Sequence, residues 1–331
     1  MTRFQRLALA TAVATYLLVV IGGTVRVTNS GLSCPDWPAC HGRLVPTADG
    51  HVLIEYFHRL FASLVSVLIL ATAAVAWRWH RRDRAAVTLA SAAIGVLIVQ
   101  ILLGGATVTQ KLSPEIVTAH LATAMLLLAT VTLTAATALA RGRPFARAGS
   151  VPLARARAFR AAAVAAAAGM YVLLLSGGYT ASSGAGTSCS GWPLCNGQVI
   201  PGGSRFVHIH FFHRFVVVLV TVAFALLVWA ALRWLRGNPA AQRMVRDSFG
   251  LFLLQIFIGA LNAWTKLLTP IRVLHLAVGA ALWTALVLIA WTGFALTRQE
   301  MTTTVETPAA GIAAGPERRA PRPGRSQEAA G

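Results

Sequence analysis

Two segments of the chain concentrate the residue types that could do chemistry. The first runs from Cys34 to Arg59 and reads CPDWPACHGRLVPTADGHVLIEYFHR, and the second runs from Cys189 to Arg214 and reads CSGWPLCNGQVIPGGSRFVHIHFFHR. Corresponding residues of the two segments lie 155 positions apart, without a gap. A gapless repeat of this length indicates a duplicated domain. Shared residues should therefore reflect architecture, and differing residues should reflect function.

Four histidines form two matched pairs inside long apolar segments. His58 and His120 belong to the first copy, and His213 and His275 stand at the same positions of the second. About six residues into a helix that rises about 1.5 Å per residue, each would lie roughly 9 Å deep. A lone histidine in an apolar helix is more often a packed residue, whereas ionisable residues inside a membrane favour function. Two depth-matched pairs on facing helices suit axial ligation of haem iron.

The cysteines form two pairs with identical spacing. The pairs are Cys34 with Cys40 and Cys189 with Cys195, and both enclose a Trp-Pro dipeptide. Three interpretations remain open. The pairs could be structural disulfides that staple exposed loops, redox-active dithiols, or, in the first copy, part of a zinc site completed by His41 and His51.

The two copies differ in charge near the histidines. Glu55 precedes His58 by three residues, on the same helix face, and its counterpart in the second copy is His210. Arg26 likewise has Ala181 as its counterpart. An acid beside an iron ligand can donate or accept a proton, or stabilise a cation. The alternative is that Glu55 caps the start of its helix.

Two further matched pairs flank the histidines. Arg59 and Arg214 directly follow the first histidine of each copy, where a guanidinium could bind haem propionates or extend to the lipid headgroups. Gln100 and Gln255 lie in the third apolar segment of each copy. The neighbouring Gly, Ala and Thr residues favour a helix-packing role for these glutamines over a cofactor role.

The composition places these residues in a membrane. Hydrophobic residues make up 56% of the chain and charged residues 12%, and the mean hydropathy is +0.66. We expect eight transmembrane helices, from apolar runs of roughly 20 residues near 7–27, 52–76, 85–108, 116–140, 161–180, 207–232, 246–267 and 271–296. The first run lacks a cleavage site and is predicted to be a retained helix. The predicted fold is an all-α integral membrane protein of two tandem four-helix bundles, related by a pseudo-two-fold axis along the membrane normal.

The basic residues report topology. The net charge is +19, but arginines gather in alternate connections: Arg78, Arg81, Arg82 and Arg84; Arg141, Arg143, Arg147, Arg155, Arg157 and Arg160; and Arg233, Arg236, Arg243 and Arg246. This positive-inside pattern predicts that both termini are cytoplasmic and that the cysteine loops lie on the outer face, where disulfides persist. It argues against a nucleic-acid partner.

The pattern also predicts four parts. Residues 1–140 would form the N-terminal half, 141–160 a basic cytoplasmic linker, and 161–297 the C-terminal half. Residues 298–331 are rich in Ala, Pro, Gly and Arg without an apolar period, which predicts a disordered cytoplasmic tail.

At these residues the chain resembles the haem A synthase family, in its bacterial form that is shared with the mitochondrial enzyme. The run GGTVRVTNSGLSCPDWPAC, the later EYFHR, the repeated histidines and the eight spans carry the resemblance, over about residues 5–297. The resemblance implies an oxidoreductase of the bacterial cell membrane that oxidises the C8 methyl of haem O to a formyl group, giving haem A for cytochrome oxidase.

The resemblance also implies roles for individual residues. His213 and His275 would hold a haem b cofactor, and haem O would enter between His58 and His120, with Glu55 at the reactive centre. The family's active cysteine pair corresponds to Cys34 and Cys40, and its more structural pair to Cys189 and Cys195. The implied partners are haem O, membrane lipid, haem O synthase and an unidentified electron-transfer protein.

Two other functions compete with this one. A membrane cytochrome b would carry electrons through two permanent haems, and a haem carrier would release its haem unchanged. The unequal halves argue against the first alternative. A substrate haem that becomes chemically altered in one site would separate the enzyme from both.

Overall fold

The computed structural model describes residues 1–43, 45, 49–140 and 151–312. The helices of this part are α1 (Arg3–Val27), α2 (Gly50–Trp79), α3 (Arg84–Thr109), α4 (Pro114–Ala140), α5 (Leu153–Ser182), the short η1 (Ala185–Thr187), α6 (Arg205–Trp234), α7 (Pro239–Trp264) and α8 (Thr269–Ile312). Eight helices within these ranges are long and apolar enough to cross a membrane. The prediction of an all-α, multi-pass membrane protein is therefore confirmed.

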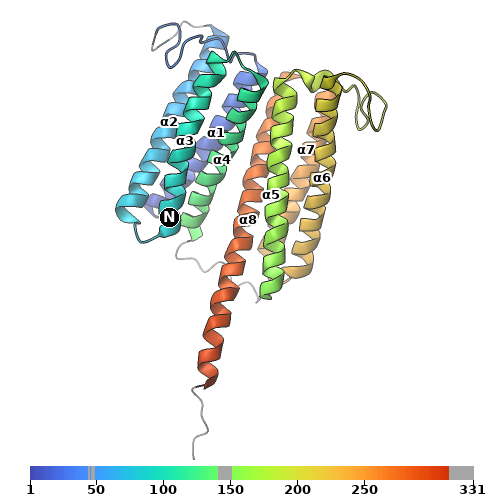
Figure 1. Ribbon diagram of the computed structural model, residues 1–331. Coiled ribbons are helices and arrows are strands. Elements are labelled where there is room, and N and C mark those ends of the chain that lie inside the picture. The colour runs from blue at the N-terminus through green and yellow to red at the C-terminus, as the bar shows by residue number, and fades with distance from the viewer. Residues whose placement is uncertain (44, 46–48, 141–150, 313–331) are drawn as a thin grey trace, which may run out of the picture.

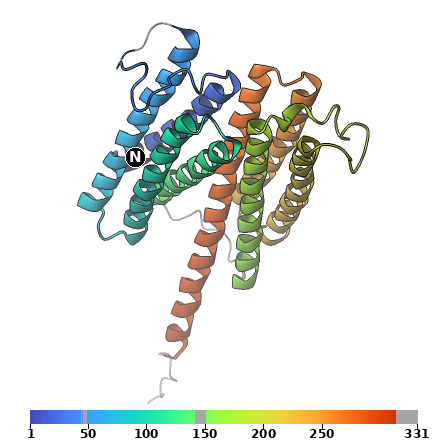
Figure 2. The same cartoon turned by 45° about the horizontal axis from the view of Figure 1, so that its top comes forward.

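The helices form two groups of four. Figure 1 shows α1 to α4 on one side and α5 to α8 on the other, with the long loops after α1 and α5 at the same end of the molecule. Helices α4 and α1 of the first group pack against α8 of the second, and α4 also packs against α5. Figure 2 shows the same arrangement from a tilted view. The two cysteine loops thus share one end, as two halves of equal direction require.

Local sequence signals explain where several helices begin. Thr2 and Gln5 form a reciprocal capping box at the start of α1. Asp49 caps α2 by accepting hydrogen bonds from two main-chain N–H groups, and Asp83 and Asn238 cap α3 and α7 by accepting from one each. These caps satisfy main-chain donors that would otherwise lack partners at the helix ends.

Reciprocal hydrogen bonds join the two halves. The Tyr16 hydroxyl donates to the carbonyl oxygen of Ala277 at 3.1 Å, and the Tyr171 hydroxyl donates to that of Ala122 at 3.1 Å. Tyr171 is the repeat counterpart of Tyr16, and Ala277 is that of Ala122. Each half therefore gives the other the same contact, which is what a pseudo-two-fold relation predicts.

Glycine and leucine repeat this reciprocity. A β-carbon built at Gly23 would lie 1.7 Å from Cδ2 of Leu276, and one built at Gly178 would lie 2.5 Å from Cδ2 of Leu121. The two glycines and the two leucines are again repeat counterparts. Each leucine follows a histidine of the predicted pairs, so the contact between halves lies directly beside the candidate site.

The structure corrects two predicted boundaries. Helix α5 begins at Leu153, so the last part of the predicted linker is helical, in a stretch rich in Ala and Arg, which are good helix formers. Helix α8 continues to Ile312 and therefore includes the first part of the predicted tail, although Pro308 and Gly311 lie within it. The remaining linker and tail, 141–150 and 313–331, lie outside the described residues.

Candidate functional site

All four predicted histidines line one cavity of about 1440 Å³ between the two halves. The remaining lining is mainly apolar and comes from both halves. Pockets that enclose one drug-sized ligand measure about 300–1,000 Å³. The cavity is therefore large enough for more than one such ligand.

Each half contributes two histidines to the cavity. His58 comes from α2 and His120 from α4, and His213 comes from α6 and His275 from α8. Among the described residues, no group of three or more His, Cys, Asp or Glu could hold a metal ion. Two imidazoles per half suit a metal that brings its other ligands with it, as haem iron does.

Each histidine ring packs against a glycine of the neighbouring helix. A β-carbon at Gly22 would lie 3.0 Å from Cε1 of His58, and one at Gly177 would lie 2.9 Å from Cε1 of His213. Gly104 and Gly259 stand in the same relation to His120 and His275, at 3.4 and 3.2 Å. The absence of a side chain at these positions lets the helices approach and fixes where the rings lie.

The ring nitrogens have few protein partners. Nδ1 of His58, His120 and His275 is buried without a hydrogen-bond partner, whereas Nδ1 of His213 lies 2.9 Å from the Ser176 hydroxyl. The position matching Ser176 in the first half is Ile21. A hydroxyl that fixes the orientation of one imidazole, with no counterpart in the other half, distinguishes the two sites.

The two glutamines also differ in their contacts. The Gln100 amide nitrogen lies 3.3 Å from Nε2 of His120, and its oxygen accepts a hydrogen bond from Thr123. The Gln255 amide donates to the carbonyl oxygen of His275 at 2.7 Å instead. The sequence pattern favoured a helix-packing role for both glutamines. Of the two, Gln100 contacts a histidine ring and Gln255 contacts a main-chain carbonyl. The Thr123 that positions Gln100 has no hydroxyl counterpart, since Val278 stands at that position.

Glu55 lies in the cavity wall and is 4% exposed. One carboxylate oxygen accepts from the Cys34 main-chain N–H at 2.8 Å, and the other accepts from the Arg59 guanidinium at 2.6 Å. The helix cap is Asp49, so the alternative that Glu55 caps α2 is wrong. In the second half, Nδ1 of His210 faces the Cys189 N–H at 3.4 Å. Both residues therefore face the main chain of a cysteine loop, and only one of them is an acid.

Arg59 and Arg214 hold the cysteine loops. Arg59 donates to the carbonyl oxygens of Asp36, Ala39 and Cys34 at 2.6–2.9 Å. Arg214 donates to main-chain carbonyls of the second loop in the same way, from Cys189 to Leu194. Both guanidinium groups are turned to these loop carbonyls. In each arginine both terminal nitrogens already donate hydrogen bonds to the protein, so few N–H donors remain that could bind haem propionates.

Both cysteine pairs are disulfides. Cys34 is bonded to Cys40 and Cys189 to Cys195, and all four are buried. His41 contacts the Ser33 carbonyl, and His51 contacts the Ser30 hydroxyl. The zinc alternative is therefore wrong for this structure, since the thiolates it requires are joined to each other.

The first cysteine loop contains an acidic residue, Asp36, which lies outside the membrane-spanning helices. The Asp36 carboxylate accepts main-chain hydrogen bonds from Gly42 at 2.7 Å and His41 at 2.6 Å. The Gly42 contact is the main reason that the pKa of Asp36 lies below its usual range. The second loop has Gly191 at the matching position and is closed by Asn196, which accepts from the Ser190 N–H at 2.8 Å.

Two arginines that line the cavity have spare donors. Arg26 of α1 donates to the Ala181 carbonyl at 3.3 Å, and its buried Nε has no partner. Arg272 of α8 donates to the Val27 carbonyl at 3.3 Å. No carboxylate in the described part of the chain pairs with either. In the sequence, Arg26 stands out only as a difference between the two copies. Arg272, whose counterpart is Val117, was not predicted as a site residue.

These features define a class of protein: a multi-pass membrane protein with a duplicated, histidine-lined cavity beneath two disulfide loops. The model of the COX15-CtaA family, described as cytochrome oxidase assembly protein, matches residues 5–53 and 49–287. The chain belongs to this family.

Several curated proteins similar to this chain are named Heme A synthase. A Heme A synthase of Alkalihalophilus pseudofirmus is 30% identical over 287 residues, which cover 86% of this chain and 95% of the relative. A Heme A synthase of Halalkalibacterium halodurans is 32% identical over 225 residues, covering 66% and 73%. One of Symbiobacterium thermophilum is 29% identical over 293 residues, covering 86% and 93%. The similarity thus extends over both halves.

Proposed function

We propose that this protein is a haem A synthase, an oxidoreductase that converts the C8 methyl group of haem O to the formyl group of haem A. Family membership and the shared name of the relatives support the reaction. The observation that carries the proposal is the single cavity lined by two pairs of buried histidines, each ring set against a glycine. Conversion of a methyl to a formyl group with an oxygen from water releases four electrons and four protons, so a separate electron acceptor is required.

The residues present fit haem in both halves. Three buried imidazole nitrogens lack partners, and the cavity offers pairs of ligands without a further metal-binding group in the described chain. His213 and His275 would hold a permanent haem b, because Ser176 fixes the orientation of His213. His58 and His120 would receive haem O. The bound haem b supplies one-electron chemistry beside the substrate site.

Glu55 contributes a negative charge at the substrate side of the cavity. One of its oxygens accepts from the Cys34 main-chain N–H and the other from the Arg59 guanidinium. Glu55 would stabilise positive charge that develops on the substrate, or take part in proton transfer. Its link to the Cys34 N–H also couples the first disulfide loop to helix α2.

Arg26 and Arg272 would bind the haem propionates, in place of the Arg59 and Arg214 that the sequence suggested. They line the cavity and retain donors without carboxylate partners. Guanidinium groups form strong, charge-assisted hydrogen bonds with carboxylates.

The arginine pattern supports an orientation in the bacterial cell membrane with both termini cytoplasmic and the cysteine loops outside. The substrate would come from a haem O synthase, and the electrons would pass to a partner that no residue here identifies. Lipid surrounds the spans, and the charge distribution gives no support to a nucleic-acid partner.

The decisive experiment is mass identification of haems extracted from membranes that contain this protein together with a source of haem O. Haem A, or its hydroxylated precursor, is the expected product. Recovery of haem b and unchanged haem O from folded protein would contradict the proposal, and would favour a cytochrome b or a haem carrier.

A further inference from the structure

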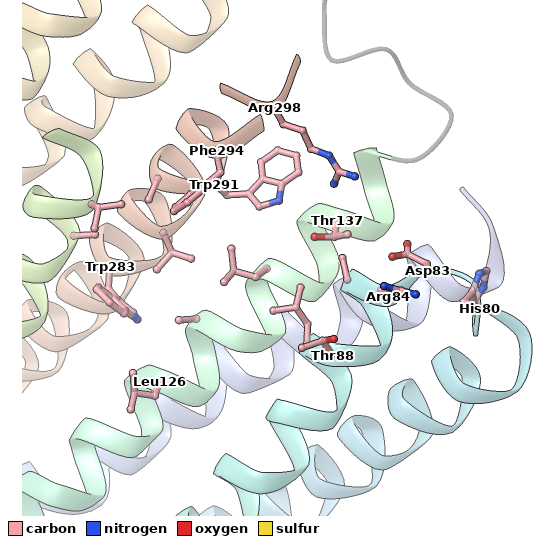
Figure 3. A pocket seen from close by; sticks show the side chains of 18 of the residues that line it. His80, Asp83, Arg84, Thr88, Leu126, Thr137, Trp283, Trp291, Phe294 and Arg298 are labelled. Carbon is pink, nitrogen blue, oxygen red and sulfur yellow. The ribbon is translucent and has the colours of Figure 1, made fainter. Parts of the chain in front are cut away.

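A second large hollow opens at the other end of the molecule, away from the cysteine loops. We call it the arginine groove; it measures about 1910 Å³ and lies between the two halves. Figure 3 shows Arg84 and Thr88 of α3 and Thr137 of α4 around the same hollow as Trp291 and Arg298 of α8. None of the four paired histidines lines it, so it is distinct from the site described above.

The two parts of the arginine groove differ in chemistry. Its mouth carries Arg78 at the end of α2, Arg81 and Arg82 from the connection that follows, Arg84 at the start of α3, and Arg298 from α8. Its floor is apolar. Leu126, Val164 and Phe294 in this floor lie in membrane-spanning helices and are 43%, 42% and 53% exposed.

The acidic residue among the described lining of the groove is Asp83, and it has a structural task. Its carboxylate accepts from the Ala86 N–H at 3.0 Å and caps helix α3. The net charge of the mouth is therefore strongly positive. Arg84 is the first residue of α3, where the helix dipole disfavours a cation, so the stability of α3 does not account for its charge.

The positive-inside pattern explains why arginines lie at this end, but not why they converge on one groove. The corresponding connection between α6 and α7 carries Arg233, Arg236, Arg243 and Arg246. None of these lines the groove. The duplicated chain thus provides two arginine clusters at the same end, and only the first of them lines this groove.

A cationic mouth above an apolar floor complements a molecule with an anionic headgroup and acyl chains. Basic pockets between transmembrane helices on the cytoplasmic side bind the headgroups of anionic lipids. We propose that the arginine groove is a binding site for an anionic phospholipid, which bridges α3 and α4 of one half and α5 and α8 of the other. This site is independent of the haem chemistry, and its side of the membrane follows from the proposed orientation.

Tryptophan fluorescence tests the site directly, because Trp291 lines the groove. The purified protein in detergent is titrated with phosphatidylglycerol that carries brominated acyl chains, which quench nearby indoles, and in parallel with brominated phosphatidylcholine. Phosphatidylglycerol is expected to quench at lower concentration, and Trp291→Phe should reduce that quenching, with the remainder coming from Trp79 and Trp283, which also line the groove. Equal affinities for the two lipids, or quenching that is unchanged in Trp291→Phe, would overturn the proposal.

Matched variants separate the groove from general surface charge. The combined R81Q, R82Q and R84Q changes should weaken phosphatidylglycerol binding by about five-fold per arginine removed. The control, R236Q with R243Q and R246Q, should leave binding unchanged. An equal loss in the control would overturn the proposal.

Two further measurements keep the test informative. Ala168→Phe narrows the groove without changing its charge or adding an indole, and should exclude the acyl chains, even if the triple variant does not fold. Haem O, which also has an apolar tail and carboxylates, is added as a competitor. Displacement of the phospholipid by one equivalent of haem O would assign the groove to the substrate and overturn the lipid site.

Discussion

At the residue scale, the candidate site depends on glycines as much as on histidines. The ring of each paired histidine occupies space that a methyl group on the facing glycine would enter. Real β-carbons almost never approach another atom closer than the 2.9–3.0 Å found at Gly177 and Gly22. Because imidazole orientation decides whether the nitrogen reaches a metal, these glycines act as positioning residues.

We expect Gly177→Ala to displace His213 and to release haem b, and Gly22→Ala to displace His58 and to weaken haem O binding while haem b remains. The bound haem is measured by its absorption spectrum and by extraction. Gly250→Ala is the control, since a β-carbon there meets nothing within 4 Å. It should be neutral, or stabilising by about 0.5–1 kcal/mol, because it lies inside helix α7. Equal haem loss in all three variants would contradict this prediction.

Glu55 differs from its counterpart in charge more than in position. Glu55→Gln keeps an acceptor for the Cys34 N–H but removes the negative charge. We expect this variant to fold, to retain haem b and to lose conversion of haem O by at least ~10²-fold, the lower range for an acid–base group. Single-turnover conversion, monitored by haem extraction, measures this loss. A variant with the normal rate would reduce Glu55 to an anchor of the loop.

At the element scale, each cysteine loop is tied to the helix that follows it. Arg59 and Arg214 donate hydrogen bonds to main-chain carbonyls of the loops. One helical turn before each arginine, Glu55 or His210 faces the main-chain N–H of the first cysteine of the loop. The disulfide, the arginine and the residue four before it therefore form one unit at the entrance of α2 or α6. This unit is common to both halves, and we infer that its main role is architectural.

The first loop should respond to acid, and the second should not. The pKa of Asp36 is lowered in the folded loop. The contribution of the Asp36 carboxylate to the stability of the folded loop is therefore complete above the ordinary aspartate pKa of about 3.9. It is lost as the pH falls through the lower pKa of the folded loop. Hydrogen-exchange protection of the Gly42 and His41 amides should fall over that range. In Asp36→Asn the protection should no longer depend on pH, and protection at Ser190, bound by Asn196, serves as the control in both proteins.

The contacts between the halves predict equal effects at related positions. Tyr16→Phe and Tyr171→Phe each remove one hydrogen bond to a carbonyl of the other half. Each should lower the free energy of unfolding by about 0.6–1 kcal/mol, the usual range for such bonds. The double variant should show the sum, because the sites are separate. Denaturation in mixed micelles measures these values, and clearly unequal losses would argue against the pseudo-two-fold relation.

The sequence predicted what the repeat and the apolar pattern encode. The helices and the pairing of His58 with His120 and of His213 with His275 follow from side-chain identity and a constant offset. The partners of Arg59 and Arg214 did not follow, because main-chain carbonyls carry no sequence signal. The helical course of α8 beyond Arg298 was not predicted, because this segment lacks an apolar period and contains Pro308 and Gly311. Ser176 could have been found by asking where the copies differ beside a predicted ligand.

At the scale of the whole molecule, duplication produces two histidine pairs but one cavity. The halves contribute equivalent glycines, leucines and tyrosines to their contact, so the two sites are neighbours by construction. Asymmetry then arises from few residues: Glu55, Ser176, Arg26 and Arg272 each lack a like counterpart. Under the proposed function, a permanent haem and a substrate haem would be held side by side in one fold.

Arg26 and Arg272 give the final prediction, because they come from different halves and line the shared cavity. If they bind propionates, the wild-type protein should prefer free-acid haem to its dimethyl ester, which has the same ring but no carboxylates. Arg26→Gln and Arg272→Gln should each weaken free-acid binding by about ten-fold or more, as expected for a hydrogen bond between charged groups, and leave ester binding unchanged. Spectroscopic titration measures the binding of both ligands.

The control is Arg214→Gln. Since Arg59 and Arg214 are engaged by the loops, this variant should weaken the binding of both ligands alike or disturb the loop alone. A loss of discrimination in Arg214→Gln, with discrimination retained in the other two variants, would return the propionates to the residues that the sequence first suggested.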